Sequence, residues 1–437
     1  MKFIKIIPII LIICLVITSC HDNEVFYTQS ICFNERQIEK KELVKSEVSL
    51  DEYTQIYRDK KGLTHYFIYS APLENENCDL QGFENEYIYK GKFVQTKFPK
   101  RFSNENGIDI ITESKKYSIF PYEDNTYTVE SKMQNNIFGL NKKCVIYKNV
   151  FGNNTEMHCY YTPFGVNFEI ILNEKPKTNK LFLKINMPDL IPEINSPDYI
   201  AMNTLYNKTK LIIYSSLAVS NGNWNYQNSV KLVKKENDTY TLEYSLNENL
   251  YKSDNSYPIK VNQSILRYTD KQPDTAVYEK ADENSKFYLS PYIVMDNKKG
   301  DNNTYIRFEN LRSFNIDYNK IVSAQYVFRN LFDLNCSAKI GAYLVKKKWC
   351  SINSIWSNKA PVDNNAFDIL TFKKAGDYEI NIKKYLKSAL KRTNAKGEND
   401  YFKRGFMLKL NSQGERALIA TGDNGLFSPY LEIVTKK

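Results

Sequence analysis

The sequence is poor in the residues that most enzymes use for acid–base and metal chemistry. Its 437 residues include three histidines, His21, His65 and His158, and no H-E-x-x-H, G-x-S-x-G, P-loop or C-x-x-C motif. His158 and Cys159 are adjacent, and adjacent side chains on a strand point to opposite faces, so we expect no shared metal ion. We therefore expect no catalysis. A polysaccharide-degrading enzyme stays open as an alternative, because a carboxylate pair or a reactive tyrosine leaves no sequence motif.

A long hydrophobic run is missing beyond the first 20 residues. No later stretch is apolar for about 18 residues, so we expect no membrane-spanning helix in the mature chain. The 60 Lys and Arg and 50 Asp and Glu residues give a net charge of +10 and are interspersed along the chain. Nucleic-acid binding typically needs a clustered basic stripe, so we expect no nucleic-acid partner. A modestly basic surface suits anionic partners such as acidic glycans, wall polymers or lipid headgroups.

The first 20 residues carry an export signal. Two lysines precede an apolar run over residues 6–16, which is too short for a stable membrane span. Ile17-Thr18-Ser19-Cys20 then reads as a lipobox, in which Cys20 becomes the acylated mature N-terminus. The alternative is an ordinary secretory signal with a chance cysteine. Because two or more acyl chains hold a protein stably on a membrane, we expect a bacterial lipoprotein anchored at the extracytoplasmic face of a membrane, on the cell surface.

Six cysteines remain after the signal segment and Cys20 are set aside. An even number outside the cytoplasm permits disulfides, although the sequence leaves the connectivity open. Two local pairs are plausible: Cys144 with Cys159, which flank a turn-like segment, and Cys336 with Cys350, which lie in neighbouring predicted strands. The alternative is that all six are buried as small hydrophobic side chains. The six are Cys32, Cys78, Cys144, Cys159, Cys336 and Cys350.

Strand periodicity dominates the chain after the first 45 residues. Residues 166–172 and 181–187 alternate apolar and polar side chains around a polar turn, and this pattern predicts a hairpin. Residues 230–246 predict a second hairpin. Apolar residues at helical spacing predict one short helix over residues 382–391. The pattern predicts an all-β protein with two mostly antiparallel, β-sandwich-like regions.

The composition divides the chain into four parts. Residues 253–261 are rich in turn formers, so we place the main boundary near residue 262. The predicted parts are a signal peptide over 1–19, a lipidated N-terminus and polar tether over 20–45, a β-rich N-terminal body over 46–262 and a β-sandwich domain over 263–437.

Several segments of the last part occur in the order of a known module. They are Asp274–Tyr278, Phe287–Ile293, Thr304–Phe308, Ile321–Tyr326, Trp349 with Trp356–Pro361, Gly405–Lys409 and Ser428–Ile433. In this order they resemble the DNRLRE domain of bacterial surface and secreted proteins, which implies a jelly-roll-like β-sandwich. Four segments of the N-terminal body resemble the region that precedes this module in wall-associated and YD-repeat proteins: Asp59–Gly62, Val145–Phe151, Phe164–Val166 and Tyr257–Ile259. The chain departs from them at Lys260–Gln263, where those proteins have I-D-P, and it shows no YD-repeat array.

Four residues are candidates for ligand contact. Some modules related to the DNRLRE fold are implicated in binding acidic polysaccharides such as alginate, and sugars stack on aromatic rings while uronates pair with basic groups. Trp224 lies in a polar, turn-rich stretch, and Trp349 and Trp356 match positions that recur as framework in the family. Arg307 lies on a predicted strand. The structural alternatives are a packed loop anchor for Trp224, a core position for at least one other tryptophan, and an Arg307–Glu309 ion pair.

These observations predict a non-catalytic, membrane-anchored surface lipoprotein that binds polysaccharide or acts as an adhesive module. The alternative is a structural or protein-interaction remnant of a wall-associated repeat protein. The expected partners are the membrane, through the lipid anchor, and a polysaccharide; the ligand and the oligomeric state stay open. We expect no cofactor, although the oxygen-rich residues Asp296, Asn297 and 301–303 leave calcium open beside an ordinary hairpin turn.

Overall fold

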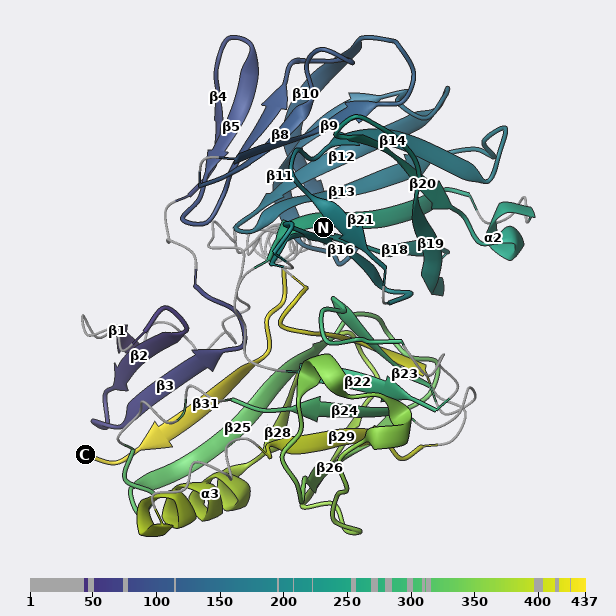
Figure 1. Cartoon of the computed structure of the whole chain (residues 1–437). Helices are drawn as coiled ribbons and strands as arrows, with labels where there is room; N and C mark the ends of the chain where they lie inside the picture. The colour runs from purple at the N-terminus through teal and green to yellow at the C-terminus, as the bar shows by residue number, and fades with distance from the viewer. Residues whose placement is uncertain are drawn as a thin grey trace, which may run out of the picture.

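The computed structural model describes residues 43–45 and most of 51–437. The gaps are 74–77, 114, 195, 207, 222, 253–256, 269–273, 280–284, 297–301, 309–310, 312–315, 397–403, 413–415 and 425. The predicted signal peptide and tether, Cys20 and Cys32 therefore lie outside the described residues. Strands make up 55% of the chain and helices 6%, which confirms the predicted all-β class. Figure 1 shows an upper and a lower β-rich body.

Two facing sheets form the upper body. The first contains, in paired order, β4 (Leu80–Gly82), β5 (Glu86–Lys90), β6 (Gln95–Pro99), β8 (Ile108–Thr112), β9 (Lys115–Pro121), β14 (Lys180–Asn186), β20 (Thr239–Ser245) and the second half of β19 (Asn223–Glu236). The second contains β7 (Arg101–Phe102), β10 (Tyr127–Asn135), β11 (Asn141–Lys148), β12 (Thr155–Thr162), β13 (Gly165–Leu172) and β21 (Ile259–Arg267).

Two successive strands continue the second sheet from the far side of β21. They are β17 (Thr209–Tyr214) and β18 (Ser216–Ser220). Beyond β17 lie β16 (Tyr199–Asn203) and the edge strand β15 (Ile191–Glu193), and beyond β18 lies the first half of β19. The short helix α2 (Glu248–Lys252) follows β20. Apolar side chains from both sheets fill one continuous core between them, because alternate residues of each strand point to the same face.

The predicted hairpin over residues 166–187 is wrong, whereas the predicted hairpin over 230–246 is confirmed. Strand β13 pairs with β12 and β21, and β14 pairs with β9 and β20. The two strands lie in opposite sheets and send their apolar side chains into the same core. Alternation identifies the buried face of a strand but not its pairing partner. In contrast, β19 and β20 pair directly, with Val230 opposite Tyr244.

The lower body is a sandwich of two further sheets. One contains β1 (Leu43–Lys45), β2 (Thr54–Asp59), β3 (Thr64–Tyr69), β31 (Tyr430–Thr435), β25 (Ile321–Asn330), β28 (Gly376–Asn381), β30 (Arg416–Ala420) and β23 (Tyr292–Asp296). The other contains β22 (Asp274–Tyr278), β24 (Asn302–Ile306), β29 (Phe406–Leu410), β26 (Ala338–Leu344) and β27 (Asp368–Phe372). The helix α3 (Lys383–Lys396) packs its apolar face on their shared core and confirms the predicted helix, with a later end.

The chain division differs from the predicted one at both ends of the N-terminal body. Strands β2 and β3 belong to the lower sandwich, because β3 pairs with β31 along its whole length and Ile68 enters the lower core. In Figure 1 the purple β3 lies beside the yellow β31. Strand β21 pairs with β13 from Ile259 to Leu266. It therefore belongs to the upper body, although the predicted boundary near residue 262 cuts through it.

The two bodies pack against each other through apolar and polar side chains. One apolar cluster joins Leu217 of the upper body to Tyr292 and Phe427 of the lower body, with Phe138 packed against it. Polar contacts cross the same interface: the Tyr292 hydroxyl donates to Asn262 Oδ1 at 3.1 Å. The Ser290 hydroxyl donates to Asp198 Oδ2 at 2.8 Å.

Candidate functional site

Three of the four predicted ligand residues meet at one corner of the lower sandwich. Arg307 directly follows β24, and Trp349 and Trp356 lie in the connection between β26 and β27. This connection contains two short 3-10 helices, η5 (Ser351–Asn353) and η6 (Trp356–Asn358). A small apolar cluster beneath the corner contains Tyr305, Val345, Trp349, Ala360 and Met407, with Tyr343, Trp356 and Val362 packed against it.

Trp349 is a framework residue of this corner. Its side chain is only 8% exposed, and its ring centroid lies 5.6 Å from that of Tyr305. The indole N–H donates to the Arg404 carbonyl at 2.7 Å. The sequence allowed a core position for at least one of Trp349 and Trp356, and Trp349 occupies such a position.

Arg307 stacks on the ring of Trp349. Its guanidinium carbon lies 4.8 Å from the ring centroid of Trp349, and its Nη1 donates to the Trp349 carbonyl oxygen. A guanidinium held by stacking and a backbone acceptor is fixed in place. Arg307 therefore has a structural role at this corner, where it holds Trp349 in position. The alternative partner Glu309 lies outside the described residues.

Trp356 lies nearer the surface, on a loop that side-chain hydrogen bonds hold in shape. The Asn358 side chain accepts from the Ile355 N–H at 2.9 Å and donates to the Asn353 carbonyl at 2.8 Å. Trp356 is half-buried, and Lys359 Nζ lies 3.0 Å from the centroid of its ring. The loop thus presents an aromatic face with an ammonium group already on it.

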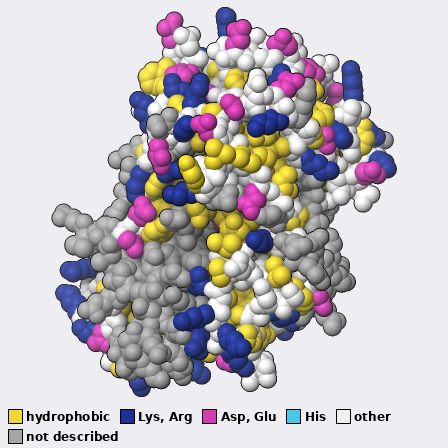
Figure 2. All heavy atoms as spheres, viewed as in Figure 1, with side chains coloured by type: hydrophobic (Ala, Val, Ile, Leu, Met, Phe, Trp, Pro, Cys, Tyr) yellow, Lys and Arg dark blue, Asp and Glu magenta, His cyan; other side chains and the backbone are white. Residues whose placement is uncertain are grey.

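Lysines lie on the same loop as the two tryptophans. The backbone N–H of Lys346 donates to the Pro361 carbonyl at 2.8 Å, and this bond brings the run Lys346–Lys348 beside the segment 359–362. All three lysines of the run are exposed. Residues 345–363 hold four lysines and a single acidic residue, Asp363, whose carboxylate lies 3.4 Å from Lys346 Nζ. Figure 2 shows dark-blue side chains over the lower body in the region of β26.

We name this cluster the Trp–Lys corner. It consists of Arg307, Lys346, Lys347, Lys348, Trp349, Trp356 and Lys359. The sequence analysis identified the aromatic residues and the arginine but missed the lysines. Their signal was readable, since three consecutive lysines directly precede Trp349.

Trp224 lies apart from this corner, at the interface between the two bodies. The guanidinium carbon of Arg416 lies 4.0 Å from the centroid of its ring. Phe332 stacks nearly parallel to it, with centroids 6.2 Å apart. Both partners belong to the lower body, whereas Trp224 lies on β19 of the upper body. Trp224 is therefore packed between the two bodies. This is the structural alternative that the sequence left open for it, and it is not an exposed platform for a ligand.

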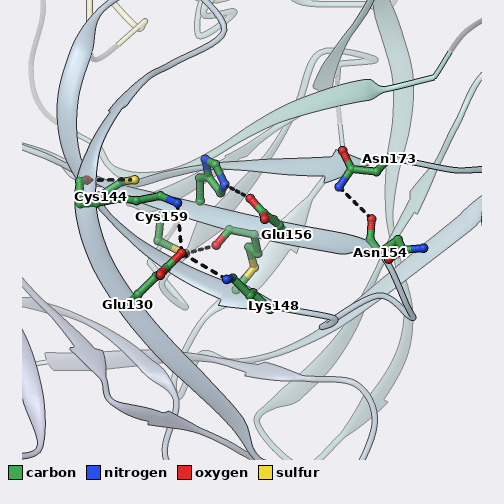
Figure 3. A network of polar contacts seen from close by, with 10 residues as sticks. Glu130, Cys144, Lys148, Asn154, Glu156, Cys159 and Asn173 are labelled. Atoms are coloured by element: carbon green, nitrogen blue, oxygen red, sulfur yellow. Dashed lines mark hydrogen bonds and ion pairs between the residues drawn. The ribbon is translucent and has the colours of Figure 1, made fainter.

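A row of polar side chains crosses the outer face of the second upper sheet. Strand register places His158 of β12 opposite Glu169 of β13, and Glu169 opposite Asn262 of β21. His158 Nε2 lies 2.6 Å from Glu156 Oε2, and burial lowers the pKa of His158. Figure 3 shows Glu156 in this region, with Lys148 reaching Glu130 nearby.

Glu169 is the most deeply buried carboxylate of this row. Its Oε1 accepts from the Ile137 N–H at 2.5 Å, and its Oε2 is buried without a hydrogen bond. Burial raises the pKa of Glu169 to about 7, and the bond from Ile137 opposes that rise. Tyr292 of the lower body covers Asn262, the neighbour of Glu169. The end of the row at Asn262 therefore lies in the interface between the bodies.

The two predicted disulfides are absent. Cys144 and Cys159 do lie on the paired strands β11 and β12, but Cys159 is opposite Val145, one residue out of step. A one-residue offset turns the two side chains to opposite faces of the sheet. Cys159 enters the main upper core, while Cys144 packs with Ile146 and Tyr160 on the other face. Cys350 is an exposed free thiol, so it forms no bridge with Cys336.

The candidate calcium residues are only partly described. Asn297 and Asp301 lie outside the described residues. The buried Asp296 carboxylate lies 3.6 Å from Arg416 Nε, so a cationic side chain already faces it. Asn302 donates to the Val294 carbonyl at 2.8 Å. Among the described residues, no group of three or more His, Cys, Asp or Glu side chains is arranged to hold a metal ion.

A small, partly open pocket of about 10 Å³, room for roughly one water molecule, lies in the lower body. It is lined by Val327, Phe328, Arg329, Asp377, Phe427, Ser428 and Tyr430. Its single carboxylate, Asp377, lies 3.5 Å from Arg329 Nη1. Glycoside hydrolysis typically uses two carboxylates across the scissile bond. This pocket therefore does not supply the pair that a degradative enzyme requires.

Comparison with known proteins assigns no family to the chain. No protein-family model matches it, and no curated protein matches it. Among solved structures, a GH31 alpha-xylosidase from Xanthomonas citri aligns with 8% sequence identity and a TM-score of 0.10, covering 90% of this chain and 38% of that chain. A TM-score this low carries no argument about fold or function.

No helix among the described residues has the length and apolar character needed to cross a membrane.

Proposed function

We propose that the protein is a lipid-anchored bacterial surface protein whose Trp–Lys corner binds an anionic polysaccharide without catalysis. The observation that carries the proposal is the charge of the loop 345–363, which holds four lysines and one aspartate together with Trp356 and places Lys359 over the Trp356 ring. The resemblance to the DNRLRE module points in the same direction. The lipobox at Ile17–Cys20 supports the location at the membrane.

The chemistry of the corner suits uronate or sulfate groups on a sugar chain. Ammonium groups make short, charge-assisted hydrogen bonds to carboxylates and sulfates. An aromatic ring packs against the apolar face of a sugar. Lys359 lies over Trp356 and moves aside or bridges to the acidic group of the sugar that stacks there. Trp349 belongs to the apolar cluster against which Trp356 packs, and Arg307 holds Trp349. Both are therefore positioning residues.

The rigid loop adds to the expected affinity. The side chains of Asn358 and Ser354 fix the loop through bonds to its own backbone, the latter by donation to the Cys350 carbonyl at 2.7 Å. A loop already held in its binding shape loses less conformational entropy when a ligand binds. Because the lysines of the run Lys346–Lys348 are exposed, salt screens their attraction. We therefore expect binding that weakens steeply as ionic strength rises.

Affinity gel electrophoresis tests the proposal. The mature chain is run through gels that contain alginate or polygalacturonate, and through gels that contain neutral dextran. We expect retardation in the acidic gels alone. The double variant Lys347→Glu/Lys348→Glu should lose at least tenfold in affinity, because it reverses two charges of the corner.

The matched control is Lys175→Glu/Lys177→Glu, which makes the same charge change on exposed lysines of the β13–β14 connection. It should migrate like the wild type after correction for free mobility. Equal loss of retardation in both double variants would show a general charge effect and contradict the corner. Absence of retardation in every acidic gel would contradict polysaccharide binding itself.

A further inference from the structure

The two most exposed large hydrophobic side chains of the described chain are neighbours. Tyr206 is 88% exposed and Leu205 is 77% exposed. Ile194 at 65% and Ile191 at 47% lie close by in the sequence. Apolar surface in water is unfavourable, and its concentration at one place typically marks an interaction site.

These residues gather at one edge of the upper body. Leu205 and Tyr206 form the turn between β16 and β17, which is closed by donation from the Thr204 N–H to the Lys208 carbonyl at 2.9 Å. Ile191 lies opposite Asn203, the last residue of β16, so it sits beside this turn. We name Ile191, Leu205 and Tyr206 the apolar tip. Ile194 lies further along the same edge.

The geometry favours a lipid surface over a protein strand as the partner. The outermost strand, β15, contains Pro192, which has no N–H to donate to an added strand. A projecting turn that carries a leucine and a tyrosine suits the membrane interface, where tyrosine places its ring among apolar tails and its hydroxyl in water.

Charge near the apolar tip agrees with an anionic bilayer. Lys208 is exposed and lies two residues from Tyr206. The acidic groups nearby have partners of their own. Asp189 pairs with Lys115 at 2.6 Å, and Glu113 pairs with Arg267 at 3.1 Å. Glu193, on β15 beside Ile194, accepts from the Asn203 amide at 2.5 Å. A basic side chain near the bilayer adds attraction to anionic headgroups.

We propose that the apolar tip inserts into the headgroup region of the anionic membrane to which the protein is anchored. This inference rests on the proposed lipid anchor, since 22 residues separate Cys20 from Leu43, the first described residue. A chain of that length spans at most about 75 Å, so the body stays within reach of the bilayer. Tethering raises the effective concentration of the tip at the surface, and a weak second contact then orients the molecule.

Vesicle flotation tests the tip separately from the anchor. The chain from residue 20 onward carrying Cys20→Ser retains every described residue and has no lipid. It is mixed with vesicles of equal parts palmitoyl-oleoyl phosphatidylglycerol and phosphatidylcholine. We expect measurable binding, and at least a fivefold loss with Leu205→Ser/Tyr206→Ser. The matched control, Phe83→Ser/Ile369→Ser, removes two other exposed apolar side chains and should bind like its parent.

A second readout places the turn in the bilayer. Tyr206→Trp in the same unlipidated chain should gain quenching by brominated lipids over the parent chain. Equal binding by the tip variant, or binding to pure phosphatidylcholine as strong as to the anionic vesicles, would overturn the inference. So would a concentration-dependent dimer in solution that the tip variant abolishes. Acyl labelling of Cys20 in the natural chain tests the anchor independently, so either idea can fail alone.

Discussion

Burial changes the pKa of the Glu169 carboxyl group. The group is buried on β13, where one oxygen accepts a backbone bond from Ile137 and the other accepts none. Burying a charge costs more than burying a neutral acid. Its pKa therefore rises from 4.5 to about 7. At acidic pH the group is neutral in the folded protein, and at alkaline pH the fold must hold its charge.

This shift predicts a stability that declines as pH rises. Between about pH 4.5 and 7 the folded state keeps a proton that the unfolded state has released, so the free energy of unfolding falls over this window. The total loss is about 3 kcal/mol. Glu169→Gln keeps an acceptor for the Ile137 N–H and does not titrate. We expect urea unfolding to show the variant gaining most of this loss, between about 2 and 3 kcal/mol, on the wild type between pH 5 and pH 8.

The control for this experiment is Glu174→Gln, on an exposed residue of the β13–β14 connection. Its stability should stay parallel to that of the wild type over the same range. A constant difference between Glu169→Gln and the wild type at both pH values would contradict the raised pKa.

Individual site residues were only partly predictable from the sequence. The sequence singled out Trp349, Trp356 and Arg307, and the structure brings the three together at one corner. Which of them faces outward depends on the path of the loop, and that path is set by amide contacts such as Asn358 to Asn353. Trp224 has the same sequence signal but is held by Arg416 from the other body. No local pattern predicts such a distant partner.

For the strands, too, the local sequence predicted some features, whereas features that depend on distant segments were not predictable. The period of two correctly identified the buried faces of β13 and β14. It did not identify their partners, and it gave no register for Cys144 and Cys159. The hairpin of β19 and β20 was predictable, because a polar turn joins two strands that pair directly with each other. The pairing of β3 with β31 joins residues near the two ends of the described chain, and no periodic pattern indicates it.

Two histidines make the strand pairings sensitive to pH in opposite directions. His65 on β3 lies 3.4 Å from Glu432 of β31 and 3.5 Å from Asp59. The hydrogen bond with Glu432 is the main cause that raises the pKa of His65 above 6.5. Its stabilisation is therefore present below pH 6.5 and is lost as pH rises through the folded pKa. Burial lowers the pKa of His158, so the folded protein favours the neutral imidazole. The free energy of unfolding therefore decreases as pH falls below 6.5, because the unfolded state takes up the proton more readily.

We expect His65→Asn to lose more stability at pH 5.5 than at pH 8.5, and His158→Asn to lose more at pH 8.5 than at pH 5.5. Thermal unfolding at the two pH values measures both, and each variant is the control for the other. The same pH trend in both variants would contradict the opposite shifts.

At the scale of the whole molecule, the lower sandwich depends on strands from the start of the described chain. Strand β3 covers one edge of β31, and Ile68 is fully buried in the lower core. The predicted domain over residues 263–437 lacks this hairpin. Expressed alone, it exposes a long strand edge and an apolar gap, and such edges typically promote aggregation. The sequence placed the boundary by composition and so could not include a hairpin some 200 residues away.

This dependence predicts the behaviour of fragments. Residues 274–437 alone should aggregate or unfold without cooperativity. A fusion of residues 51–73 to that fragment through a Gly/Ser linker should be soluble and unfold cooperatively. The matched control is the fusion with Ile68→Asp, which buries an unpaired charge and should cost about 3 kcal/mol. Size-exclusion chromatography and urea unfolding measure both properties. Equal solubility of all three would contradict a structural role for β3.

The central claim is that the Trp–Lys corner binds acidic sugar chains, and tryptophan fluorescence tests it most directly. The chain has three tryptophans, of which Trp356 alone combines the corner with a loop position near the surface. Titration of the mature protein with oligogalacturonate should give a saturable change in emission. The change should vanish in Trp356→Phe and persist in Trp224→Phe. No saturable change, or a change that persists in Trp356→Phe and vanishes in Trp224→Phe, would contradict the account.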